Sequence, residues 1–226
     1  MKRLSLLVGA IALSTAVFAQ RPTEGNPFSL EGQLSLSALN QTFSAPSVKL
    51  RYFAADNISI RLGLGFDNAT DVTNAYGNGN DGNPSADSVG VWTSKASNTM
   101  IAIGGAYHFS QMDRLSPYGF LDVMIGMGGT NDEMENYDGN TDSYMKGANS
   151  TMESKYSTFG LNIGAGFDYY FAENVFVGAE VGFLFNSWKD KDGSMTVNST
   201  TTTIHPSGNN SAFMTNSFGL RLGWRF

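Results

Sequence analysis

The sequence has no cysteine, six prolines and two histidines among its 226 residues. Without cysteine the chain can form neither a disulfide nor a thiolate metal site, so another kind of interaction must stabilise its fold. After residue 20 there is also no apolar run of the roughly 18 or more residues that a transmembrane helix needs. These absences argue against a disulfide-stabilised secreted domain and a helical membrane protein.

Basic residues are also scarce, since 14 Lys and Arg stand against 20 Asp and Glu and give a formal net charge of −6. Nucleic-acid binding calls for clustered Lys and Arg side chains that neutralise phosphates. The acidic balance of this chain therefore does not favour a nucleic-acid partner.

The first 19 residues have the features of a secretory signal peptide. Lys2 and Arg3 give a positive start, residues 4–18 form a short apolar run, and Ala19 supplies the small residue of a V-x-A cleavage site. An N-terminal membrane helix is the alternative, but the run is short and no stop-transfer segment follows it. We expect cleavage after Ala19 and a short periplasmic tail at 20–27.

The rest of the chain contains eight segments in which bulky apolar residues alternate with small or polar ones. Leu62 and Leu64, for example, alternate with Arg61 and Gly63. A period of two is typical of a β-strand with two different faces. Most of the segments are long enough to cross a bilayer when tilted, which takes about 9–11 residues. The predicted strands are 28–38, 48–54, 58–67, 100–109, 118–127, 159–171, 175–185 and 218–226.

The connections between these strands alternate in length. Those expected on one side are tight turns, and three of those on the other side are long and rich in Asn, Gly, Ser, Thr and Asp. Short periplasmic turns and long extracellular loops are typical of outer-membrane barrels. The long loops are expected at about 68–98, 130–157 and 186–212.

The composition of the two strand faces favours a barrel in lipid over a water-soluble sandwich. Leu, Ile, Val and Phe supply one face, whereas Gly, Ser, Ala and charged residues supply most of the other. A sandwich core needs bulky side chains on its inner faces, while a small barrel has room only for small ones. In hydrocarbon, moreover, only a closed sheet pairs every backbone group. The predicted fold is an all-β, eight-stranded antiparallel up-and-down transmembrane β-barrel over residues 28–226.

Charged residues on the predicted inward face number five of each sign. Buried charges persist only when they are paired, so we expect a neutral salt-bridge belt that plugs the lumen. The alternative is an open sheet with these charges in solvent, which would leave two sheet edges unprotected. The ten residues are Glu31, Lys49, Arg51, Arg61, Asp67, Asp122, Asp168, Glu180, Arg221 and Arg225.

The chain resembles the small outer-membrane β-barrels of the OmpA/OmpX-like type. The residues that carry the resemblance are the strand 218–226, the hairpin 171–175 with the sequence Phe-Ala-Glu-Asn-Val, and the strand opening 117–120. The resemblance covers the chain from about residue 27 to Phe226, and a peptidoglycan-binding domain is not expected.

The resemblance implies location in a bacterial outer membrane, with the lipid bilayer and lipopolysaccharide as surroundings. It also implies that alternating apolar residues before a C-terminal Phe form the signal that the barrel-assembly machinery reads. These residues are Phe218, Leu220, Leu222, Trp224 and Phe226.

Few residues suggest catalysis or metal binding. His108 is expected to point inward as a polar residue of the lumen, and His205 lies in the last long loop without a convincing catalytic partner. Asp190-Lys191-Asp192-Gly193 is a poor match to a calcium loop, because Thr201 stands where an EF-hand needs Glu. We expect no catalytic site, cofactor or metal centre, although weak divalent binding by acidic loops stays open.

Three functions remain compatible with the sequence. The first is a plugged barrel with a structural or surface-interaction role, the second a narrow pore for ions or small solutes, and the third a lipid-modifying enzyme of the outer leaflet. The balanced inward charges favour the first. The loop aromatics Trp92, Tyr137 and Tyr144 could anchor an extracellular partner or fold back over the barrel rim, and the partner itself is not predicted.

Overall fold

The computed structural model describes residues 25–37, 43–78, 84–109, 112–206 and 210–226. The expected signal peptide at 1–19 and most of the expected tail at 20–27 lie outside these ranges. Within them, no helix is long and apolar enough to cross a membrane.

The described residues form eleven β-strands, and eight of these make one closed antiparallel ring. The ring strands are β1 (Phe28–Ser37), β2 (Phe43–Ala55), β3 (Ile58–Asn78), β4 (Pro84–His108), β5 (Leu115–Glu135), β8 (Ser150–Ala172), β9 (Val175–Val197) and β11 (Asn210–Arg225). The others are the short strands β6 (Tyr137–Asp138), β7 (Ser143–Tyr144) and β10 (Thr200–Ile204).

The ring closes between its first and last strands. Strands β1 and β11 pair antiparallel, from Ser29 opposite Arg225 to Ser37 opposite Ser217. Phe28 and Phe226 complete the closure by exchanging backbone hydrogen bonds of 3.0 and 2.8 Å. All remaining pairings in the ring join strands that follow one another in the chain. The predicted fold class, an eight-stranded up-and-down antiparallel barrel, is therefore confirmed.

The alternation in sequence becomes an apolar outside and a polar inside. Leu62, Ile103 and Leu222 face outward and are exposed, whereas Arg61 and Arg221 on the same strands are buried. A sheet with this polarity would be unstable in water, because its largest apolar face is on the outside. Lipid around the barrel removes that cost.

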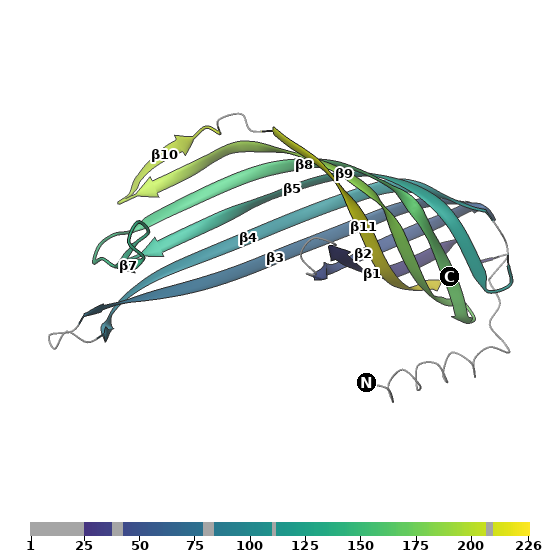
Figure 1. Ribbon diagram of the computed structural model, residues 1–226, viewed down its shortest axis with the longest axis horizontal. Coiled ribbons are helices and arrows are strands. Elements are labelled where there is room, and N and C mark those ends of the chain that lie inside the picture. Colours follow the sequence, from purple (N-terminus) through teal and green to yellow (C-terminus); the bar gives the residue numbers. More distant parts are fainter. Residues whose placement is uncertain (1–24, 38–42, 79–83, 110–111, 207–209) are drawn as a thin grey trace.

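Five ring strands continue far beyond the length needed to cross a bilayer. Strands β3, β4, β5, β8 and β9 contain 21 to 25 residues each, whereas β1, β2 and β11 contain 10, 13 and 16. Figure 1 shows the long strands leaving the barrel together as a curved sheet, with β7 and β10 at its far end. We call this part the extended sheet and define it as residues 67–78, 84–98, 129–135, 150–158, 189–197 and 200–204.

The extended sheet contains most of the residues expected to form the three long loops. Most of 68–98, 130–157 and 186–212 is paired strand, with ladders that run out to Asn78 opposite Pro84 and to Ser150 opposite Val197. Asn198 and Ser199, both at positive φ, form the two-residue turn from β9 to β10. Beyond the bilayer both faces of a strand meet water, so the period of two that marks a strand is lost there.

A small hairpin at the tip folds back onto the extended sheet. Tyr137 of β6 is buried and packs against Trp92 of β4, with 6.1 Å between ring centroids. The Trp92 indole N–H donates to the Asp132 carboxylate at 3.3 Å. These contacts place the rings of Trp92 and Tyr137 against each other on the extended sheet.

The turn of this hairpin is held by Asp138. Its carboxylate accepts hydrogen bonds from the backbone N–H of Asn140 at 3.0 Å and the hydroxyl of Thr141 at 2.9 Å. These donors favour the ionised carboxylate and lower the pKa of Asp138. The hairpin is therefore an ordered cover on the sheet.

Candidate functional site

The structure gathers eight of the ten charges singled out from the sequence into one contact network inside the barrel. Arg225 is also buried, but its guanidinium lies over the Phe53 ring at 3.9 Å and donates to the Asn26 carbonyl at 2.6 Å. Asp67 is exposed near the rim and takes part in none of the ion pairs found among the described residues. Arg225 and Asp67 are thus outside the network that the strand pattern suggested for them.

Four fully buried side chains form a closed square of alternating charge. Arg51 binds Glu31 and lies 2.9 Å from Asp168. Arg221 likewise binds both carboxylates, with 2.6 Å to Asp168. Each cation contacts both anions and each anion contacts both cations. The square joins β2, β1, β11 and β8, so it connects the first and last strands of the ring.

A second layer of charge is centred on Glu180. Its carboxylate lies 3.1 Å from the Lys49 ammonium, 2.7 Å from Arg61 and 3.6 Å from the Nε of Arg221. Arg61 also pairs with Asp122 at 3.1 Å. Glu180 therefore links this layer to the square through Arg221.

Tyr118 reinforces that link. Its hydroxyl donates to Glu180 at 2.8 Å and accepts from Arg221. We call these nine side chains, eight charges and Tyr118, the luminal network.

The luminal network is neutral and draws on almost every ring strand. It contains four cations and four anions, and in the described structure β4 is the one ring strand that contributes no charge. At the matching height β4 has Gly104, directly opposite Asp122. Buried charges are tolerated when each is paired, and every charge of the network has an ion-pair partner. The guanidinium nitrogens of Arg61 make these ion pairs without a well-aligned hydrogen bond among the described residues.

Three of the four carboxylates that pair with Arg51 and Arg61 come from strands that are not hydrogen-bonded neighbours of theirs. Arg51 and Arg61 are direct neighbours on β2 and β3, where two like charges would repel each other. Their carboxylate partners lie on β1, β5, β8 and β9. The repulsion between adjacent strands is thus offset by attraction through the barrel interior.

Aromatic side chains fill the lumen between the charges and the short turns. Phe53, Tyr118, Phe120, Tyr170 and Phe176 are all buried there. Arg61 lies over the Phe120 ring at 4.3 Å and Arg51 over the Phe176 ring at 5.2 Å, which are favourable cation–π geometries.

His108 belongs to this aromatic layer. It is buried, with its Nδ1 2.7 Å from the Ser116 hydroxyl and its ring 4.9 Å from that of Tyr118. This matches its expected place in the lumen. Sequence reasoning placed all these residues on the inward face but did not recognise a layer, because aromatic residues are also ordinary strand residues.

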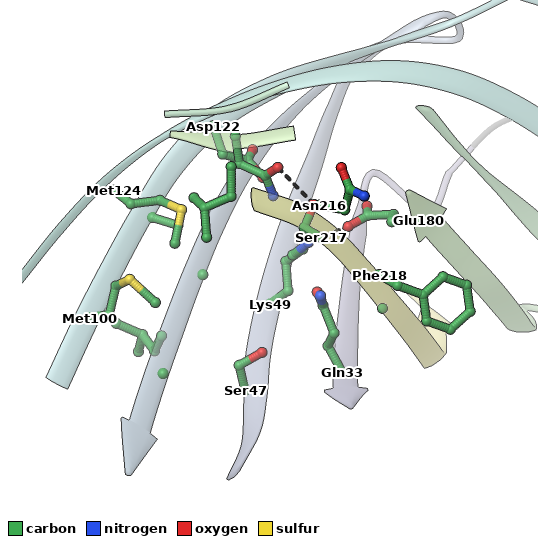
Figure 2. Close-up of a pocket in the computed structure, with 17 residues that line it drawn as sticks. Gln33, Ser47, Lys49, Met100, Asp122, Met124, Glu180, Asn216, Ser217 and Phe218 are labelled. Atoms are coloured by element: carbon green, nitrogen blue, oxygen red, sulfur yellow. Dashed lines mark hydrogen bonds and ion pairs between the residues drawn. The ribbon is translucent and has the colours of Figure 1, made fainter. Parts of the chain in front are cut away.

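On the other side of the luminal network, toward the long hairpins, the lumen contains a cavity of about 270 Å³. Lys49, Asp122 and Glu180 form its charged base. Figure 2 shows Met100 and Met124 on one side of the cavity and Glu180 on the other. Asn162 accepts a hydrogen bond of 3.0 Å from Ser217 in the same wall. The network therefore separates an open upper lumen from an aromatic-filled lower one.

The apolar residues singled out as an assembly signal lie together on the outside of β11 and at Phe226 directly after it. Phe218, Leu220, Leu222, Trp224 and Phe226 are all exposed, and the Trp224 and Phe226 rings contact each other at 4.9 Å between centroids. They form a continuous outward stripe on the strand that closes the barrel.

His205 lies outside the luminal network, directly after β10 of the extended sheet. Its Nδ1 is 3.1 Å from the Asp192 carboxylate, but the two side chains are 75% and 62% exposed. An imidazole and a carboxylate in open water do not provide the desolvated, oriented setting that acid–base catalysis requires.

A comparison with protein-family models matches residues 5–226 to a family described as "Outer membrane protein beta-barrel domain". A comparison with curated proteins finds no match.

The solved structures to which this chain is similar include a major outer membrane protein from Thermus thermophilus. It is 14% identical, with a TM-score of 0.50, over 90% of this chain and 100% of that one. The N-terminal β-barrel domain of Pseudomonas aeruginosa OprF is 18% identical, with a TM-score of 0.35, over 90% and 100%. Acinetobacter baumannii CarO is 7% identical, with a TM-score of 0.41, over 91% and 100%. At 14% identity, the similarity to the Thermus thermophilus protein is evidence about the fold alone.

Proposed function

Because this chain belongs to the family of outer-membrane β-barrel domains and is located in the bacterial outer membrane, we propose that it is a closed, non-conducting barrel that anchors an extracellular β-sheet. The barrel is the membrane part, and the extended sheet is the part that meets the surroundings. Its role is structural or one of surface interaction, and a narrow pore is the competing function.

The luminal network is the observation that carries this proposal. A pore needs a continuous aqueous path, and the lumen of an eight-stranded barrel is narrow enough for side chains to fill. Here the charges of seven strands meet in the middle, and aromatic rings occupy the space below them. The cavity of about 270 Å³ above the network is then closed at its lower end by the network.

Single-channel recording of the refolded mature protein in a planar bilayer tests the proposal. We expect a closed or barely flickering trace, because an ion would have to displace paired buried charges to pass. A neutral double variant, Arg61→Ser with Asp122→Ser, should also stay closed, since the square of Glu31, Arg51, Asp168 and Arg221 is intact in it. Steady open conductance of the wild-type protein would support the pore instead and make the network a set of selectivity residues.

Enzymatic activity on outer-leaflet lipids is not part of the proposal. Its simplest form would use His205 with Asp192, and the exposure of both side chains argues against it. We expect the His205→Ala variant, expressed in cells that lack the wild-type protein, to leave the lipid A and phospholipid profiles unchanged by mass spectrometry. A changed profile that wild-type protein restores would contradict this expectation.

The outward faces suggest the partners of the barrel. We propose that its apolar belt contacts the bilayer and lipopolysaccharide, and that the outward stripe of β11 is read by the barrel-assembly machinery. The stripe supports this because its apolar residues are contiguous on the closing strand.

A further inference from the structure

Four methionines gather near the outer end of the extended sheet. Met134 is on β5, Met152 on β8 and Met195 on β9, while Met145 comes from the segment between β7 and β8. All four line one cavity of about 590 Å³. We call them the methionine cluster. It is separate from the luminal network and from the cavity above that network.

The strand register places three of these side chains on one face of the sheet. Met152 lies directly opposite Met195, and on its other side directly opposite Asp132. Met134 is two residues from Asp132 on the same strand and therefore faces the same way. Side chains directly opposite have Cβ atoms about 4.5–5.5 Å apart, and diagonal neighbours about 7–8 Å, which long side chains can bridge.

Three of the four methionines of the cluster are exposed, and Met134 is half-buried. Met145, Met152 and Met195 are 55%, 40% and 40% exposed. The folded-back hairpin borders the same cavity through buried Tyr137. The result is an open, partly covered site in which long side chains with three rotatable bonds can turn their sulfur atoms toward a common centre.

The composition of the lining distinguishes this site from an ordinary apolar patch. Among the described residues that line the cavity, the aliphatic and aromatic ones besides the methionines are Tyr137, Ala148 and Val197. Leu, Ile and Phe are absent from that lining, although they dominate the outer face of the barrel. A surface selected only for being apolar would be expected to contain the Leu, Ile and Phe residues of the lipid-facing belt. What these four positions share is a thioether sulfur.

Thioether sulfur is a soft donor that selects soft cations such as Cu(I) over Ca²⁺, Mg²⁺ and Mn²⁺. The surroundings are also negative, since residues 130–157 contain six acidic and two basic residues, and a negative field raises the local cation concentration. No group of three or more His, Asp and Glu side chains gathers as a site for harder metals in the described ranges. We propose that Met134, Met152 and Met195, with Met145 from the segment between β7 and β8, form a binding site for a soft monovalent cation, Cu(I) or Ag(I).

Titration of the refolded mature protein with silver nitrate, in chloride-free buffer and followed by calorimetry, tests the proposal. We expect saturable binding at one site. Protein labelled with ¹³C at the methionine methyl groups should show shifts of the methyl resonances of the methionine cluster, with those of other methionines unchanged. Anaerobic Cu(I), supplied from a chromogenic chelator, should bind in the same way, and excess Ca²⁺ should not compete.

The decisive variant replaces Met134, Met152 and Met195 with Leu, which keeps the apolar bulk and removes only the sulfur. It should lose the saturable Ag(I) isotherm while refolding to the same heat-modifiable band on a gel. Its matched control replaces the exposed methionines Met112 and Met214 with Leu and should bind like the wild-type protein. Equal Ag(I) affinity in the triple variant and the wild type, or no saturable binding by the wild type, would overturn the proposal. A partner that binds wild type and triple variant alike, without Ag(I) binding, would identify an apolar docking surface in its place.

Discussion

Replacing Arg221 with Met should lower the free energy of unfolding by about 3–5 kcal/mol, the usual cost of removing one partner from a buried ion pair. Arg221 contacts both carboxylates of the square, Glu31 and Asp168, and also reaches Glu180. Without it the two carboxylates of the square share Arg51 alone, and the lumen carries an uncompensated negative charge. The loss comes from the unpaired anions, because Met fills much of the volume that Arg221 occupied.

Urea unfolding of the barrel refolded into lipid vesicles, followed by tryptophan fluorescence, measures this loss. The control is Lys95→Met, which breaks an ion pair of 3.3 Å with Glu133 on the extended sheet, where the side chains are 51% and 47% exposed. Such an exposed pair contributes about 0–1 kcal/mol. Adding Glu31→Gln to Arg221→Met restores the charge balance and should recover part of the stability. Equal stability of the Arg221 and Lys95 variants would mean that the luminal network does not hold the barrel together.

A single methyl group at Gly178 should also destabilise the barrel. A Cβ at this position would lie 2.6 Å from the Nη2 of Arg221 and 2.9 Å from a carboxylate oxygen of Asp168. Neither group can move freely, because each is held by the square. We expect Gly178→Ala to cost about 1–3 kcal/mol, as overpacking of a well-filled interior does.

Gly32→Ala is the matched control for Gly178→Ala. Gly32 is a strand glycine on β1, and a Cβ added there would meet nothing within 4 Å. The substitution should be neutral or stabilise the barrel slightly, since Gly is less favourable than Ala in a strand. The same unfolding assay compares the two variants. If both alanines are tolerated equally, the square has more room than the structure gives it.

The membrane part of the fold could be predicted from the sequence, because lipid and lumen impose opposite preferences on alternate residues. The starts of the strands at Phe28, Ile58 and Val175 agree with the structure. The outer ends of the second and third of these were placed too early, at 67 where β3 continues to Asn78 and at 185 where β9 continues to Val197. Beyond the bilayer both faces are wet, so hydrogen bonding continues while the pattern that reveals a strand disappears.

The candidate site was predictable in part for a similar reason. Alternation along each strand identified which charges point inward, but it carries no information about contacts across the lumen. Arg51 and Arg61 are neighbours that would repel each other, and only the closed barrel brings Asp168 and Glu180 to them. Asp67 shows the limit of the method, since it has the inward parity yet lies at the rim.

The extended-sheet features escaped the sequence reasoning for a different reason. The methionine cluster depends on the pairing of β5, β8 and β9 over residues that had been assigned to loops. Once those residues are strands, Met152 and Met195 become cross-strand neighbours although they are far apart in the sequence. No local pattern of residues marks such a pair.

The closed square of charges also has a consequence for the order in which the barrel can form. Glu31 and Arg51 sit on the first two strands, whereas Asp168 and Arg221 arrive with the later strands β8 and β11. With the other ring strands in place, the network holds four carboxylates against three cations. Strand β11 brings Arg221, the fourth cation, and at the same time joins the two edges of the sheet. Edge closure and charge neutralisation are therefore one event, and a barrel that lacks its last strand is penalised twice. The luminal network therefore favours the complete barrel over one that lacks β11.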